Sequence, residues 1–206
     1  MALPSPIRTK IARIAGLLSD PRAEWPRIDA DRESAREVIL GWVLPLSAIG
    51  PVARAVGSLV FGWGAFGITQ KPTPIAALTT AVTGYVLSVL GTLFVAFALA
   101  GTAPSFGGVK DSRQAIKLAA YSATAIYLAG AFQLVPGLVF LGVFGGYGFY
   151  LLYLGASALL RVPADRAQPF ALAMVAAAIV TYVAVFIAIG AVDGAFTPIP
   201  TLTHPA

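Results

Sequence analysis

Residues 170–192 read FALAMVAAAIVTYVAVFIAIGAV, a stretch without a single charged side chain. A helix of about 20 apolar residues crosses the hydrocarbon core of a bilayer, so this stretch alone predicts a transmembrane span. Four similar stretches precede it. The five predicted spans are 38–66, 75–103, 115–135, 137–160 and 170–192. We expect all of them to be helices, because backbone that faces lipid must satisfy its own hydrogen bonds. The predicted fold class is therefore an all-α polytopic membrane protein with five transmembrane helices.

The composition excludes most other classes of protein. Apolar residues make up 58% of the 206 residues and charged residues 11%, and the mean hydropathy is +0.82. A soluble domain carries about a quarter charged residues, so neither a water-soluble globule nor a disordered chain fits. There is no cysteine, and the single histidine is His204. Disulfides, thiolate metal sites and His-based catalytic sites therefore lack their residues. We expect no enzyme, no metal and no cofactor.

The basic residues predict the orientation of the spans. Cytoplasmic loops of membrane proteins carry an excess of Lys and Arg. The segments on the side opposite the N-terminus contain a single basic residue, Lys71. The segments that share a side with the N-terminus contain twelve basic residues: Arg8, Lys10, Arg13, Arg22, Arg27, Arg32, Arg36, Lys110, Arg113, Lys117, Arg161 and Arg166. We therefore expect a cytoplasmic N-terminus, an extracytoplasmic C-terminus and a location in the cell (inner) membrane.

The chain divides into three predicted regions. They are a cytoplasmic N-terminal region (1–37), a five-helix transmembrane domain (38–193) and a short extracytoplasmic tail (194–206). The N-terminal region has no apolar core of the kind that a cleavable signal peptide requires, so we expect it to be retained.

The N-terminal region contains a predicted amphipathic helix. Ser5 and Pro6 are typical of a helix start, and the next apolar residues share one stripe at helical spacing. One interpretation is an interfacial helix on the cytoplasmic leaflet, and the other is a helix packed on the ends of the spans. For the first, the expected membrane-interface residues are Ile7, Arg8, Ile11, Arg13, Ile14, Leu18 and Trp25. Arg8 and Arg13 would contact lipid headgroups, and a tryptophan beside arginines is typical of a membrane interface.

Arg54 is the one charge well inside an apolar stretch, about 24 Å from the start of the first span at 1.5 Å per residue. It can snorkel to the outer headgroups or pair with Asp193, or it can form an intramembrane polar site. Pro45, Gly50 and Pro51 predict a kink or break in the same span. A broken span with a charge hints at transport. The many glycines of 142–155 indicate close helix packing first, and a pore or an oligomer second.

Two stretches resemble the Yip1 family of five-span membrane proteins, and its bacterial branch in particular. The first is LLSDPRAEWPRI (17–28) followed by EVILGWVLPLSAIG (37–50), and the second is GGYGFYLLYLGASALL (145–160). The resemblance covers about residues 15–193. It implies an all-helical integral membrane protein with a cytoplasmic N-terminus. Eukaryotic members, which are linked to vesicle traffic and small GTPases of the Rab type, carry a DLYGP-type motif. This chain has only Ser19, Asp20 and Pro21 there, so the Rab association does not carry over.

These observations predict a non-enzymatic multi-pass membrane protein that organises membrane or partner proteins. The alternative is a small oligomeric transporter or channel that uses the broken first span and Arg54. The expected partners are the lipid bilayer, including anionic lipids, and either a second copy of the chain or another membrane protein. Nucleic acid is not an expected partner.

Overall fold

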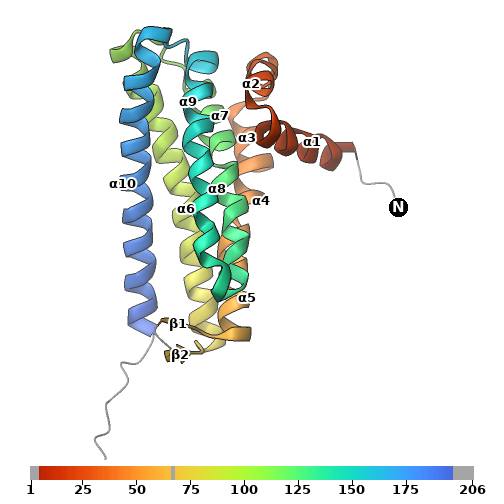
Figure 1. Ribbon diagram of the computed structural model, residues 1–206, viewed down its shortest axis with the longest axis vertical. Coiled ribbons are helices and arrows are strands. Elements are labelled where there is room, and N and C mark those ends of the chain that lie inside the picture. Colours follow the sequence, from red (N-terminus) through yellow and green to blue (C-terminus); the bar gives the residue numbers. More distant parts are fainter. Residues whose placement is uncertain (1–4, 66–67, 197–206) are drawn as a thin grey trace, which may run out of the picture.

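The computed structural model describes residues 5–65 and 68–196. It confirms an all-helical fold with five helices that are long and apolar enough to span a membrane (Figure 1). These candidate spans are Ala35–Phe61, Pro74–Phe106, Ser112–Leu134, Pro136–Leu160 and Ala164–Val192. Each overlaps a predicted span, because long uncharged stretches are the strongest signal that a membrane sequence carries.

The first span is helical throughout but irregular, as its prolines predict. It runs through α3 (Ala35–Val38), the π-helical η1 (Ile39–Val43), α4 (Leu44–Ser47) and α5 (Ile49–Phe61). Pro45 has no N–H to donate to the carbonyl four residues back, at Gly41. The Lys10 ammonium donates to this Gly41 carbonyl oxygen over 2.6 Å. The irregular turn is therefore also the point where the N-terminal region is tied to the first span.

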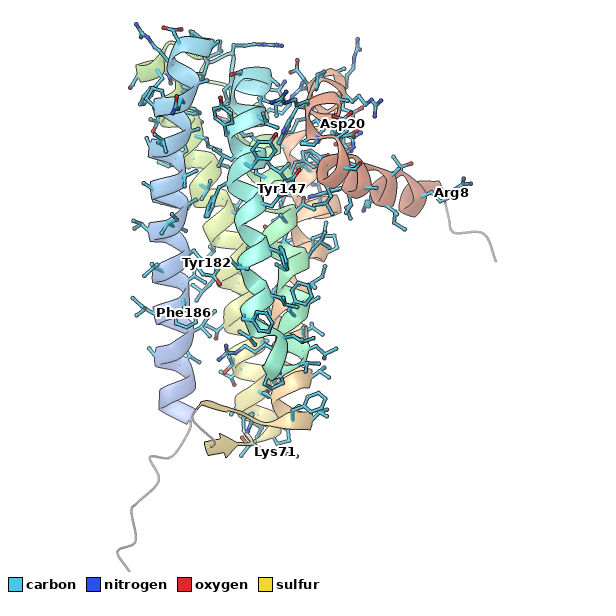
Figure 2. The ribbon with its side chains drawn as sticks, in the orientation of Figure 1. Arg8, Asp20, Lys71, Tyr147, Tyr182 and Phe186 are labelled. Atoms are coloured by element: carbon cyan, nitrogen blue, oxygen red, sulfur yellow. The ribbon has the colours of Figure 1, made fainter. Side chains whose placement is uncertain are left out.

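The first span ends earlier than predicted, at Phe61 and not at residue 66. Gly62 has φ 80°, a backbone conformation that favours glycine, and it ends the helix. The chain then forms a short hairpin that the sequence did not predict, in which β1 (Trp63–Ala65) pairs antiparallel with β2 (Ile68–Gln70). This hairpin lies near Lys71, at the end of the bundle opposite Asp20 (Figure 2).

The second, third and fourth spans combine α-helix with tighter 3₁₀ turns, whereas the fifth is α-helical throughout. The second consists of α6 (Pro74–Thr102) and η2 (Ala103–Phe106), and α10 (Ala164–Phe196) contains the fifth. The third and fourth spans are the most irregular. Their elements are α7 (Ser112–Ser122), α8 (Thr124–Ala129) and η3 (Gly130–Leu134), then η4 (Pro136–Gly146) and α9 (Tyr147–Leu160).

Glycines allow the closest helix contacts in the bundle. A Cβ at Gly57 of α5 would meet the carbonyl oxygen of Leu134, and that of Gln133 at 2.7 Å. A Cβ at Gly130 would lie 2.8 Å from the Gly50 Cα. At these positions the small residues therefore let neighbouring helices approach closely, as predicted. It does not hold at Gly142, where a Cβ would meet nothing within 4 Å.

Helix α10 lies at the edge of the bundle, beside α6 (Figure 1). Only 6% of its most apolar 18-residue stretch is buried inside the protein. Its contact with α6 includes Gly91, where a Cβ would approach Thr181 and Val185. Tyr182 and Phe186, labelled in Figure 2, are exposed. The bilayer is therefore the natural environment of most of this helix.

Two helices form the N-terminal region at the charged end of the bundle, which we define as the end that contains Asp20. Helix α1 (Ser5–Ser19) projects sideways from the bundle, whereas α2 (Pro21–Ala30) stands above it and beside α9 (Figure 1). Asp20 separates the two helices, and its carboxylate accepts a hydrogen bond from the Ala23 N–H at 3.2 Å. Pro21 takes the first helical position, where its missing N–H has no cost.

Candidate functional site

The main polar site of the protein joins the N-terminal region to the charged end of the bundle. Lys117 of α7 is fully buried. Its ammonium donates to the carbonyl oxygen of Ile28 at 3.0 Å and to that of Asp31 at 2.5 Å. Both carbonyls lie at the C-terminal end of α2, where unpaired carbonyl groups attract a cation. Lys117 therefore fastens α2 to the third span.

Asp29 adds two contacts on the same surface. Its carboxylate accepts a hydrogen bond from the Gln114 side chain at 2.8 Å, and it forms an ion pair with Arg161 at 2.8 Å. Gln114 belongs to α7, whereas Arg161 directly follows α9. The C-terminal end of α2 is thus held by a residue of the third span and by the residue that follows the fourth span.

Arg13 of α1 pairs with carboxylates of the protein and is not directed to lipid. Its guanidinium pairs with Asp31 at 2.5 Å and with Glu24 at 3.5 Å. It also lies 5.6 Å from the centroid of the Tyr121 ring. Burial lowers the pKa of Arg13, but the hydrogen bond to Asp31 and the surrounding charges outweigh it, so the pKa is raised overall. Arg13 was a predicted headgroup contact, and this position corrects that prediction.

Trp25 is a second correction. The sequence predicts it at the lipid interface, but only 1% of its surface is exposed. It lies against α9 beside Gly155, where an added Cβ would come within 2.8 Å of the indole ring. The same Cβ would come within 2.5 Å of Leu118. Trp25 is thus a core residue that packs α2 onto the bundle, and Gly155 provides the space for its ring.

The remaining predicted interface residues differ in exposure. Arg8 lies exposed at the far end of α1, away from the bundle (Figure 2). Ile11 is 50% exposed and Leu18 is 43% exposed, whereas Ile14 packs partly against the core. The side chain of Ile7 lies outside the described residues. The apolar stripe predicted from the sequence does not include Leu17, which is fully buried and holds the end of α1 in place.

A small pocket of about 60 Å³ lies between α1 and the start of the first span. Its walls come from α1, from the segment that leads into the first span, and from α7. The lining residues are Thr9, Lys10, Arg13, Glu33, Glu37, Val38, Gly41, Trp42 and Tyr121. The Tyr121 hydroxyl donates to Glu33 at 2.7 Å. Arg13 belongs both to the pocket and to the polar site described above, so the two are adjacent.

Arg54 lies in α5, one turn beyond Pro51 and towards the opposite end of the bundle. Its side chain is half-buried and engaged within the protein. Asp193 lies in α10, and its side chain falls outside the described residues. A pairing between these two groups, or an intramembrane polar site, therefore stays a prediction.

A protein-family model for the Yip1 domain matches residues 15–187 of this chain. The matched region begins within α1, includes the residues of the polar site except Arg13, and extends into α10. The chain belongs to the Yip1 domain family. Yip1 domain proteins are generally non-enzymatic multi-pass membrane proteins, which agrees with the predicted resemblance. No curated protein and no solved structure matches the chain.

Proposed function

We propose that this Yip1 protein organises the surface of a bacterial inner membrane, with its N-terminal region on the cytoplasmic side. The observation that carries the proposal is the placement of α1. This helix projects sideways from the bundle, while Lys117 and Trp25 attach the following segment to the spans and Arg13 pairs with that segment (Figure 1). A helix held crosswise to the spans, with a partly apolar exposed side, suits the interface between headgroups and acyl chains.

The charges support this orientation. Exposed arginines of the N-terminal region lie at the charged end, whereas Lys71 lies at the opposite end (Figure 2). An excess of basic residues on one side favours the cytoplasmic face, and anionic lipids attract basic segments there. Because Arg13 is paired within the protein, Arg8 is the remaining predicted headgroup contact on α1.

Spin labels test whether α1 enters the bilayer. The natural chain has no cysteine, so each added cysteine is a unique labelling site. In reconstituted full-length protein, nitroxides at Ile11→Cys and Leu18→Cys should be more accessible to oxygen than to a water-soluble nickel complex. A label at Arg22→Cys, an exposed position on α2, should show the reverse. If the labels at positions 11 and 18 behave like the label at 22, α1 lies in water and the interfacial role is wrong.

Purification in native lipid nanodiscs tests the organising role. We expect mass spectrometry to find a partner protein that co-purifies with the wild-type chain and is depleted in an Ile11→Ser/Leu18→Ser variant. The control is Arg22→Ser, which alters an exposed side chain outside α1. A retained small molecule that is lost in Arg54→Ala, without any protein partner, would contradict the proposal and favour the transporter alternative.

A further inference from the structure

We infer that the pocket between α1 and the first span binds the headgroup of an aminophospholipid, a zwitterion with one phosphate and one primary ammonium. The inference goes beyond the organising role, and its test does not depend on where α1 lies. It rests on the charges that line the pocket, on the partners those charges already have, and on the depth of the pocket along the first span.

The pocket has walls of opposite charge. Lys10 and Arg13 come from α1, and Glu33 and Glu37 come from the segment that begins the first span. A purely anionic ligand would meet two carboxylates, and a purely cationic one would meet the lysine. A ligand with separated opposite charges can pair with both walls.

The existing partners show which of these charges can serve a ligand. Arg13 is already compensated by Asp31 and Glu24. Lys10 donates to a neutral acceptor, the Gly41 carbonyl, and an ammonium has three donors. Among the described residues, Glu33 and Glu37 form no ion pair, and their hydrogen bonds come from the neutral groups of Tyr121 and Ser34.

Among the described residues that line the pocket, the charged groups without an ion-pair partner are therefore one cation and two carboxylates. A carboxylate has room for several hydrogen bonds, so Glu33 and Glu37 can accept more from a ligand. This balance favours a ligand whose cationic group donates hydrogen bonds. A primary ammonium has three such donors, whereas the quaternary ammonium of choline has none. The phosphate of the same headgroup would bind Lys10.

The position of the pocket indicates a lipid and not a soluble zwitterion. Val38, Gly41 and Trp42 line it, and they belong to the first turns of the first span. Leu40 is 53% exposed beside Gly41, and Ile11 is 50% exposed beside Lys10. Apolar surface next to a charged pocket at the start of a span matches the junction between a headgroup and its acyl chains.

Native mass spectrometry of the detergent-purified full chain tests the site with short-chain lipids. The probes are dihexanoyl-phosphatidylethanolamine, dihexanoyl-phosphatidylcholine and dihexanoyl-phosphatidylglycerol. We expect the ethanolamine lipid to bind about tenfold more tightly than the other two, as one or two charge-assisted hydrogen bonds would produce. Equal binding of the three lipids in the wild-type chain would overturn the inference without any variant.

Two conservative substitutions locate the ammonium site. Glu33→Gln keeps an acceptor for the Tyr121 hydroxyl, and Glu37→Gln keeps the capping box with Ser34. The double variant should lose the tenfold preference and bind the ethanolamine and glycerol lipids alike. Asp165→Asn, an exposed carboxylate in α10, is the matched control and should keep the preference. Unchanged selectivity in the double variant would overturn the inference.

Lys10→Gln tests the phosphate contact. Since all three probes carry a phosphate, this variant should weaken all three to a similar degree and leave their order unchanged. Lys110→Gln is the control, because Lys110 is exposed in the loop between the second and third spans, outside the pocket. A loss confined to Lys110→Gln, or no loss with Lys10→Gln, would contradict the assigned phosphate contact.

Discussion

Trp25→Ala should detach the N-terminal region from the bundle. The indole ring is almost fully buried and lies against Gly155 and Leu118. Removing a buried tryptophan typically costs about 3–5 kcal/mol, because the lost contacts leave a cavity. In detergent, we expect the thermal unfolding midpoint to fall by about 10 °C. Limited trypsin digestion should cleave at Arg22 and Arg27 much faster than in the wild-type chain.

Tyr182→Ala is the matched control for this variant. Tyr182 is also a large aromatic residue, but it is 59% exposed on α10. Its removal should leave the digestion rate at Arg22 and Arg27 unchanged. If both variants behave alike, or if Trp25→Ala changes neither measurement, the core position of Trp25 is wrong and the predicted interface role returns.

The five spans could be predicted because each depends on a local property of the chain. A stretch such as 170–192 has to be a helix in lipid whatever its neighbours are, so composition and length suffice. Irregularity in the first span was also predictable, since Pro45 removes a specific helical hydrogen bond. The early end at Phe61 was harder to foresee, because Gly62 ends the helix through its backbone conformation within a stretch that stays apolar.

The polar site could not be predicted from periodicity, because its contacts join residues far apart in sequence. Arg13 and Trp25 have the pattern of interface residues, and only their partners show otherwise. One signal was available in the sequence. Lys117 lies just inside the third span, where an unpaired cation is costly. The carboxylates Asp29, Asp31 and Glu33 lie just before the first span, on the same predicted side of the membrane. A buried cation without a partner in its own span predicts contact between the two regions, although it does not identify the backbone carbonyls that bind the ammonium.

Lys117→Met should weaken the same attachment by removing its central polar contact. Methionine has a similar length and fills the space, but it cannot donate to the carbonyl oxygens of Ile28 and Asp31. Two hydrogen bonds from a charged group are lost and two carbonyls are left without their donor, a change of about 3 kcal/mol. We expect faster tryptic cleavage at Arg22 and Arg27 and a lower thermal midpoint.

Lys110→Met separates this effect from a general loss of positive charge. Lys110 is exposed at the same end of the bundle, so its removal changes the net charge equally but breaks no buried contact. Lys117→Arg adds a second comparison: the charge stays, but the bulkier guanidinium does not fit the space of a fully buried ammonium. If Lys110→Met accelerates cleavage as much as Lys117→Met, the attachment depends on net charge. If only the Lys117 variants do so, geometry at the C-terminal end of α2 holds the N-terminal region in place, and with it the position of α1.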